Sequence, residues 1–110
     1  MRTGVRGAGA ATVVLVGLDN DALGLVRETL AAEAVLPSAS IGFQEALGVV
    51  QRTRPDVVIV AYSSGPEAAL ELGELLRKEP RQSTLVALAE ASSADAILGA
   101  MRVGYKEFVV

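Results

Sequence analysis

The chain has 110 residues, of which 51% are hydrophobic and 4% aromatic, and its formal net charge is -3. This length allows one compact domain, whose core must be built from Val, Leu, Ile and Ala. The acidic balance argues against a nucleic-acid surface, which needs clustered cations to displace counterions from phosphates. The sequence has no Cys and no His, which removes disulfides, thiol nucleophiles, imidazole bases and nearly every zinc site. We therefore expect no cofactor and no metal centre.

Residues 1–11, rich in Gly and Ala, are expected to form a flexible leader. A signal peptide is disfavoured because the apolar run from Thr12 to Leu18 is short and breaks directly into Asp19-Asn20-Asp21. No segment reaches the ~20 apolar residues that a membrane-spanning helix needs, so no membrane insertion is expected. The predicted domain covers residues 12–110 and is expected to be cytoplasmic.

Strand and helix patterns alternate along the rest of the chain, separated by short breaks. In chain order, strands are expected at 12–17, 36–41, 57–61, 84–89 and 107–110. Helices are expected between them, at 21–33, 44–53, 66–78 and from a cap at Ser92 up to Gly104. The third strand, Val57 to Ala61, is apolar on both faces, which is typical of a buried parallel strand. The weak second strand, broken by Pro37, suits a sheet edge.

Capping-box sequences mark the start of the third and fourth helices. Ser64 is expected to cap the third helix, with Glu67 reaching back, and Ser92 and Asp95 are expected to cap the fourth. The fourth helix should end at Gly104 in a left-handed turn. Its buried side is expected to consist of Ile97, Leu98 and Met101.

This order of elements predicts an α/β fold of the flavodoxin-like class, a doubly wound five-stranded parallel sheet of order 2-1-3-4-5 with right-handed crossovers. A fifth helix would normally cover the sheet beside the first helix, and the sequence predicts none. We therefore expect an apolar strip of the sheet, near Thr12 to Val16 and Val109-Val110, to be exposed or covered by a partner. The chain is interpreted as one domain of a longer polypeptide, or as one that a partner chain completes.

In sheets of this kind, ligands bind at the loops that follow the carboxyl ends of the strands. Two segments of this chain, Arg54 to Ala61 and Gly104 to Val110, resemble parts of response-regulator receiver domains, whose fold is CheY-like. The resemblance implies a set of phosphorylation residues. Receivers carry an adjacent acidic pair after strand one for Mg²⁺, an Asp nucleophile ending strand three, a Thr or Ser ending strand four and a Lys ending strand five.

This chain departs from that pattern at each of these positions. The first loop has Asp19 and Asp21 in place of an adjacent acidic pair. Strand three ends on Ala61 and strand four on Ala89, and the Lys position lies beyond the last residue. A methyl group can neither attack phosphorus nor hydrogen-bond a phosphoryl oxygen. The two Asp residues fit helix caps better than a vestigial Mg²⁺ site, because helix N-termini favour acids. We therefore predict a receiver that cannot be phosphorylated and that is not an enzyme.

The apolar strand after Pro55-Asp56, the acid-poor loops and the ending Gly104 to Phe108 resemble, more narrowly, the atypical receiver domain of TadZ/CpaE-type pilus assembly proteins. This resemblance implies that a ParA/MinD-like ATPase domain follows the receiver, although the chain itself has no phosphate-loop motif. It also implies a role at the cell pole in positioning the tight-adherence pilus secretion machinery. The expected partners are protein components of that machinery.

The face formed by the fourth helix and the fifth strand is the surface on which receivers usually dimerise. Here it is marked by Met101, Arg102, Tyr105, Lys106 and Phe108. Ordinary solvated helix surface is the alternative interpretation. Two functions stay open: a protein-interaction module, with homodimerisation included, or a degenerate signalling receiver that senses a small molecule in the emptied pocket. The residues expected to line that pocket are Gly17, Ala61 and Ala89.

Overall fold

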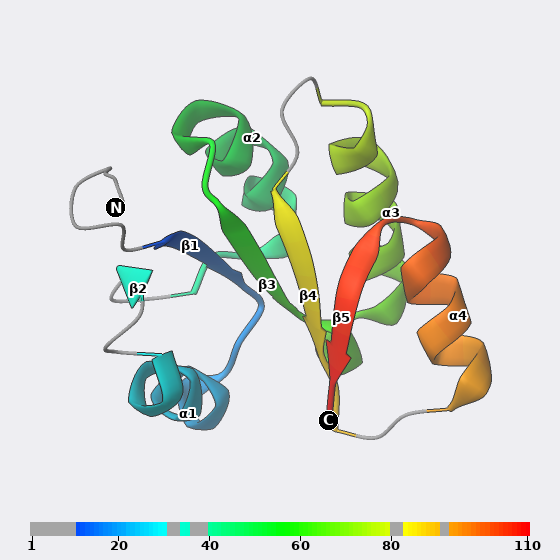
Figure 1. The fold of residues 1–110 in the computed structure, drawn as a ribbon, viewed down its shortest axis with the longest axis horizontal. Helices are drawn as coiled ribbons and strands as arrows, with labels where there is room; N and C mark the ends of the chain where they lie inside the picture. Colours follow the sequence, from blue (N-terminus) through cyan, green and yellow to red (C-terminus); the bar gives the residue numbers. More distant parts are fainter. Residues whose placement is uncertain (1–10, 31–33, 36–39, 80–82, 91–92) are drawn as a thin grey trace.

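The computed structural model describes residues 11–30, 34–35, 40–79, 83–90 and 93–110. Strands and helices alternate along these segments (Figure 1). The strands are β1 (Ala11–Val16), β2 (Ala34–Val35), β3 (Val57–Ala61), β4 (Thr84–Leu88) and β5 (Tyr105–Val109). The helices are α1 (Asn20–Leu30), α2 (Phe43–Thr53), α3 (Pro66–Arg77) and α4 (Ala94–Arg102), with a 3-10 turn, η2 (Tyr62–Ser64), before α3. Of the predicted leader, only Ala11 lies among the described residues, and it begins β1.

The strands form a parallel sheet in the order β2-β1-β3-β4-β5. Its continuous part consists of β1, β3, β4 and β5, whereas β2 pairs with β1 only through Ala34 and Val35. At the centre of the sheet, Val58 and Val60 of β3 are fully buried, as a run of β-branched residues requires in a strand covered on both faces. The predicted α/β class, with helices around a parallel sheet, is confirmed.

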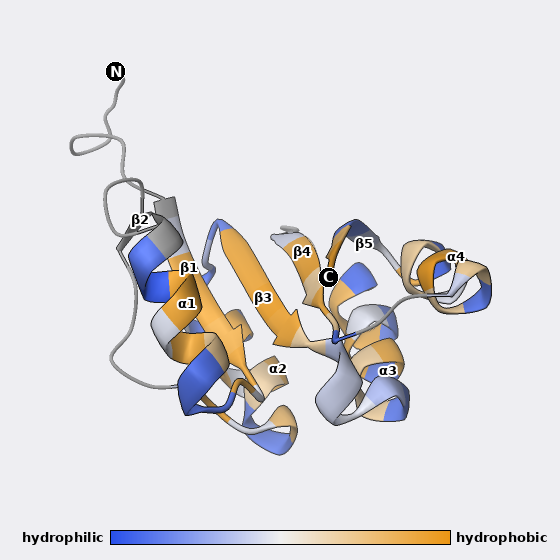
Figure 2. Ribbon diagram, turned by 90° about the horizontal axis from the view of Figure 1, so that it is seen from below, coloured by the Kyte–Doolittle hydropathy of each residue, from blue (hydrophilic) through white to orange (hydrophobic). Residues whose placement is uncertain are grey.

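Helices cover the two faces of the sheet unequally. The larger core, which includes Val58, Leu72 and Leu85, forms where α2, α3 and α4 pack on one face. On the opposite face, α1 packs over residues of β1 and β3 such as Leu15 and Ile59. Figure 2 shows both of these strands as apolar along their length. The predicted uncovered strip therefore does not lie along β1, because α1 covers that strand.

The second strand begins at Ala34, earlier than predicted. β2 is formed by Ala34–Val35, ahead of the predicted segment 36–41, and residues 36–39 of that segment lie outside the described residues. Ile41 returns to the sheet, because its N–H donates to the Leu15 carbonyl and its carbonyl accepts from the Gly17 N–H. Pairing with β1 decides where this edge strand forms, and local apolar content does not reveal that pairing.

The predicted capping box of the third helix is absent. Pro66 is the first residue of α3, and its N-cap is Gly65, which has no side chain to bond the helix amides. Ser64 belongs to η2 instead. Pro is favoured at the first helical position because its missing N–H would be unbonded there anyway. The helix therefore begins at Pro66, as predicted, but without a side-chain cap.

The cap of α4 also differs by one residue from the prediction. The Ser93 hydroxyl accepts from the Ala96 N–H at 3.1 Å, and the predicted cap Ser92 lies outside the described residues. Gly104 follows the helix with a φ of +110°, so the predicted left-handed turn is confirmed.

The buried side of α4 was largely mispredicted. Leu98 and Met101 are 52% and 47% exposed, whereas Ala100 is fully buried. The residue that follows α4 lies close to α3, since a Cβ added to Gly73 would be 2.8 Å from the Val103 side chain. Ala100 belongs to the larger core, and Leu98 and Met101 lie outside it.

Candidate functional site

A hollow of about 250 Å³ opens at the carboxyl ends of the strands, between α1 and the end of β5. Three of the predicted phosphorylation-site positions, Asp19, Ala61 and Ala89, line it together. Asp21 does not line it and lies exposed in the first turn of α1. The other lining residues are Ala22, Leu25, Ser63, Ser64, Leu88, Glu90, Val109 and Val110. This rim is the part of an open α/β sheet at which ligands usually bind.

Two methyl groups occupy the positions at which the resemblance to receivers predicts the acceptor and the hydroxyl. Ala61 is the last residue of β3 and is buried in the apolar cluster below α1. Ala89 follows β4, and its N–H donates to the Val109 carbonyl at 2.8 Å. Neither side chain can act as a nucleophile or hold a cation.

Asp19 caps α1. Its carboxylate Oδ1 accepts from the Ala22 N–H at 2.8 Å, and its carbonyl accepts from the Leu23 N–H at 2.9 Å. This is the geometry of an N-cap residue, which satisfies backbone amides that have no partner within the helix. Within the described segments, no group of three or more potential metal-ligating side chains occurs.

Ser63 connects the two loops that form the rim of the hollow. Its hydroxyl accepts from the Glu90 N–H at 2.8 Å, which ties the loop after β3 to the loop after β4. Glu90 was not predicted at this rim. The available signal was position, since Glu90 comes two residues after the last residue of the apolar strand β4.

Gly17, predicted to line the emptied pocket, is not among the residues that line the hollow. It has a φ of +73° and lies against Phe43, whose ring would be 2.7 Å from a Cβ at this position. Glycine is needed here for both the left-handed conformation and the close approach. The prediction failed because the loop after β1 turns toward α2 at this residue.

Tyr105 was predicted on the interaction surface, and this prediction is wrong. The residue is only 3% exposed, because β5 begins at Tyr105 and its side chain points under α3. Its hydroxyl donates to the Ala69 carbonyl at 2.9 Å. Burial raises the pKa of Tyr105 well above its usual range, and the nearby Tyr62 raises it further.

The other residues of the predicted interaction surface differ in exposure. Met101, Arg102 and Lys106 are exposed, and Leu98 joins them on the outer side of α4. Phe108 is half-buried, with its ring edge-to-face to Tyr62 at a centroid distance of 5.3 Å. Phe108 is therefore chiefly a packing residue.

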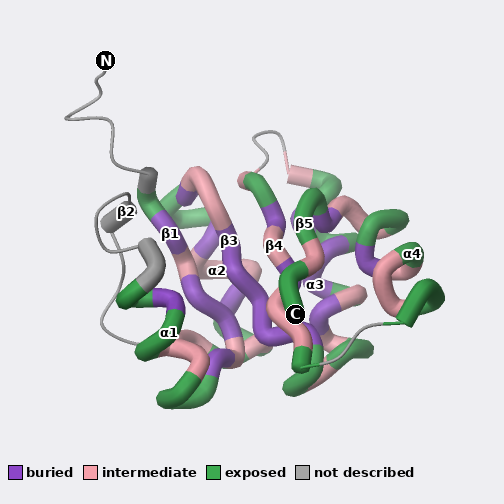
Figure 3. Tube along the Cα trace, turned by 60° about the horizontal axis from the view of Figure 1, so that its bottom comes forward, coloured by how far each residue is buried: buried purple, intermediate pink, exposed green. Residues whose placement is uncertain are grey.

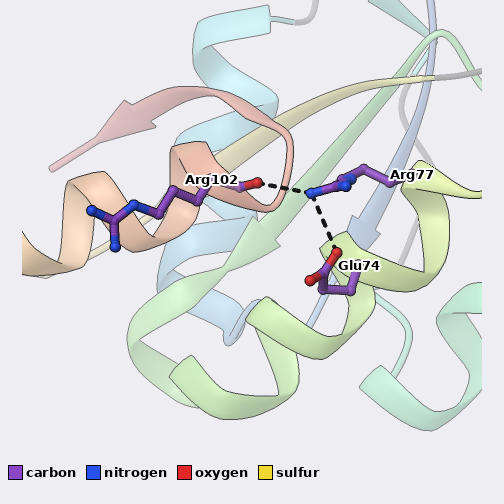
Figure 4. A network of polar contacts seen from close by, with 3 residues as sticks. All are labelled: Glu74, Arg77 and Arg102. Atoms are coloured by element: carbon purple, nitrogen blue, oxygen red, sulfur yellow. Dashed lines mark hydrogen bonds and ion pairs between the residues drawn. The ribbon is translucent and has the colours of Figure 1, made fainter.

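The end of α4 is fixed to α3 by one arginine. Arg77 Nη1 donates to the Arg102 carbonyl at 3.0 Å and lies 3.4 Å from a Glu74 carboxylate oxygen (Figure 4). A cation at this carbonyl complements the negative end of the α4 dipole. The exposed side of α4 is thus held at a defined position relative to α3.

No family model matches the chain, and no curated protein matches it. Several solved structures do match this chain. A response regulator from Thermotoga maritima aligns with a TM-score of 0.73 at 21% identity, covering 91% of this chain and 83% of its own. A response regulator from Hahella chejuensis aligns with a TM-score of 0.74 at 24% identity, covering 90% of this chain and 79% of its own. The receiver domain of the putative response regulator NarL from Mycobacterium tuberculosis aligns with a TM-score of 0.74 at 16% identity, covering 91% of this chain and 82% of its own. The chain therefore has the fold of a response-regulator receiver domain.

Within the described part of the chain, no helix is both long enough and apolar enough to cross a membrane.

Proposed function

We propose that this chain is a receiver-like protein-interaction module that is not phosphorylated on aspartate and catalyses no reaction. The observation that carries the proposal is Ala61, which ends β3 at the hollow where a receiver requires its nucleophile. Ala89 removes the hydroxyl expected at the same rim, and the nearby Asp19 carboxylate is engaged as a helix cap. With no nucleophile at the end of β3 and no cluster of metal-ligating side chains among the described residues, phosphoryl transfer to aspartate has no route at this hollow.

The more specific proposal is a role in tight-adherence pilus assembly. The ending Gly104 to Phe108 resembles the pseudo-receivers of TadZ/CpaE-type proteins, and the rim without an acceptor agrees with that resemblance. The module would then dock components of the pilus secretion machinery, with the protein in the cytoplasm at the cell pole. The exposed side of α4 with β5 is the candidate contact, formed by Leu98, Met101, Arg102 and Lys106.

Phosphorylation is tested directly with acetyl phosphate, or with beryllofluoride, in the presence of Mg²⁺. We expect no mass increase and no change of amide chemical shifts around the hollow. A receiver that has the acceptor Asp serves as the positive control in the same reaction. Stoichiometric, acid-labile phosphate on this chain would overturn the proposal.

The pilus role is tested in cells with a fluorescent fusion of the protein in its natural length. Met101→Glu and Lys106→Glu should abolish polar foci and co-purification of secretion components, since both change an exposed side chain. Glu71→Lys, an exposed change on α3, is the matched control and should leave both unchanged. Foci that are unaffected by the two α4–β5 variants would remove this surface from the proposal.

Small-molecule sensing is the second candidate function, and the hollow favours it. Its walls combine the apolar side chains of Leu88 and Val109 with the polar groups of Ser63 and Glu90, as small-ligand sites commonly do. Ala61→Leu should fill the hollow. If a screened metabolite raises the melting temperature of the wild type, that variant should lose the effect, whereas Leu98→Ala should keep it.

A further inference from the structure

A cavity of about 160 Å³ lies at the opposite end of the sheet from the hollow, between the end of α3 and the first residues of β4 and β5 (Figure 1). Its inner wall includes three buried apolar residues of the larger core, Val50, Leu76 and Leu85. On β4, the first residue is exposed and the second is buried, a change that can be followed along the strand in Figure 3. This cavity, which we call the amino-end cavity, therefore reaches from the surface to the apolar core.

The outer wall of the amino-end cavity carries charges of both signs. Lys106 lines it from β5, Glu79 from the segment after α3, and Arg77 from the last turn of α3. The Arg77 guanidinium is already engaged, because its Nη1 donates to the Arg102 carbonyl at 3.0 Å and lies 3.4 Å from a Glu74 carboxylate oxygen. The charges left to act on a ligand are therefore those of Lys106 and Glu79.

The partners of these residues favour a ligand with two opposite charges. The Glu79 carboxylate accepts from the side-chain amide of Gln51 at 3.1 Å, a neutral donor that leaves the charge in place. Among the described residues, neither Glu79 nor Lys106 has an ion-pair partner. The Ser83 hydroxyl, also on the wall, donates to the Pro55 carbonyl at 2.6 Å, so its oxygen is left to accept. The wall thus offers acceptors at Glu79 and Ser83 and a cationic donor at Lys106.

We propose that the amino-end cavity binds a free α-amino acid with an apolar side chain about the size of that of leucine. The ammonium group binds Glu79 and Ser83, beside the carbonyl end of α3, which also favours a positive charge. The carboxylate binds Lys106, and the side chain lies against the apolar inner wall. A simple anion or cation fits less well, because it would leave one charge of the wall without a partner when it displaces water.

The size of the amino-end cavity suits this class of ligand. A protein cavity of about 150 Å³ holds a benzene-sized molecule, and the isobutyl side chain of leucine is smaller than benzene. An apolar floor with a few polar groups placed around it is also the usual construction of small-ligand sites. The indole side chain of tryptophan is larger than benzene, so tryptophan should not enter.

The inference goes beyond the proposed function and does not depend on it. No residue lines both the amino-end cavity and the hollow. Lys106 also belongs to the contact proposed above on α4 and β5, whereas Glu79 belongs to the cavity alone. Glu79 therefore carries the test that separates the two proposals.

The first test compares L-leucine with three analogues in NMR titrations of the isotope-labelled protein. Isocaproate lacks the ammonium group, isoamylamine lacks the carboxylate, and glycine lacks the side chain. Leucine should shift the amides of Thr84, Leu85 and Lys106, and each analogue should bind at least tenfold more weakly. A dissociation constant above ~10 mM for leucine would overturn the proposal. So would equal affinity for leucine and any analogue, or leucine-dependent shifts confined to the hollow.

The second test assigns the ammonium contact. Glu79→Gln keeps the shape of the side chain and removes its charge, so leucine should bind at least tenfold more weakly. The affinity for isocaproate, which has no ammonium group, should stay within twofold. Glu71→Gln changes an exposed carboxylate of α3 that does not line the cavity, and it should leave both affinities within twofold. Circular dichroism melts show that both variants are folded.

Two results would contradict this assignment. One is an equal loss of affinity for leucine and isocaproate in Glu79→Gln, because the variant would then have changed the cavity and not the ammonium contact. The other is an equal loss of leucine affinity in Glu79→Gln and Glu71→Gln, which would mean that only the overall charge of the protein matters.

Discussion

The Tyr105 hydroxyl donates a hydrogen bond to the Ala69 carbonyl across 2.9 Å, joining the start of β5 to α3. Tyr105→Phe removes this hydrogen bond and keeps the ring. We expect the free energy of unfolding at pH 7 to fall by about 0.5–1.5 kcal/mol, the usual net value of such a bond. Urea unfolding followed by circular dichroism measures the change. An unchanged midpoint would show that the bond adds nothing to stability.

Stability should also fall at alkaline pH, because burial raises the pKa of Tyr105 in the folded chain. In the unfolded chain, a tyrosine titrates near pH ~10. Below that pH, both states hold the proton and Tyr105 contributes no pH dependence to stability. Above it, the unfolded chain releases the proton first, so the free energy of unfolding falls by about 1.4 kcal/mol per pH unit until the folded state also titrates.

The control for this pH dependence is again Tyr105→Phe. The difference in unfolding free energy between wild type and variant should stay constant from pH 7 to 9 and shrink above pH ~10, as the wild type loses its advantage. Parallel curves up to pH ~11.5 would mean that the hydroxyl titrates normally in the folded chain.

Ile59 should contribute strongly to stability. It is 4% exposed at the centre of the sheet, in the apolar cluster below α1. Ile59→Ala should cost about 2–5 kcal/mol through lost transfer energy and a cavity. Leu25→Ala, at a side chain that is 64% exposed, should change stability by no more than about 0.5 kcal/mol. Similar losses in the two variants would place the core elsewhere.

Two glycines of the helices should respond to alanine in opposite directions. At Gly73 of α3, a Cβ would lie 2.8 Å from the Val103 side chain and 3.1 Å from its carbonyl oxygen. Gly73→Ala should therefore destabilise by about 1–3 kcal/mol. At Gly24 of α1, a Cβ meets nothing within 4 Å, and Gly24→Ala should stabilise by about 0.4–1 kcal/mol. Thermal melts of both variants measure the contrast.

Local patterns predicted the central elements of the fold well. β3 lies at the predicted residues, Val57–Ala61, because a run of β-branched residues bounded by Pro55-Asp56 allows few alternatives. The hollow was predicted in the same way. Parallel strands bring their carboxyl ends to one rim, so Asp19, Ala61 and Ala89 meet although they are far apart in sequence.

Side-chain hydrogen bonds between distant residues were not predictable. Asp56 reads locally as a break before β3, but its carboxylate accepts from both the backbone N–H and the hydroxyl of Thr12, at 3.0 and 3.2 Å. This contact fixes the start of β1 against β3. No pattern within either segment indicates it, because the partner is 44 positions away.

The predictions for helix α4 and strand β5 were wrong about which residues are buried. The largest apolar residues of α4 were predicted on the core side, but the small Ala100 is the buried residue of this helix and Leu98 is exposed. Tyr105 was predicted on the surface because the face formed by the fourth helix and the fifth strand is the one on which receivers usually dimerise. A buried carbonyl partner on Ala69 makes the Tyr105 hydroxyl compatible with the core.

The chain has no Trp, so Tyr62 and Tyr105 supply its intrinsic fluorescence. Both rings are buried and 6.4 Å apart, in the larger core between the sheet and α3. Tyrosine emission therefore reports unfolding of that one region and is insensitive to events on the opposite face. Because the chain has no Trp, the opposite face gives no emission when Trp is excited selectively. A single Leu25→Trp substitution would give a fluorophore beside the hollow that can be excited selectively.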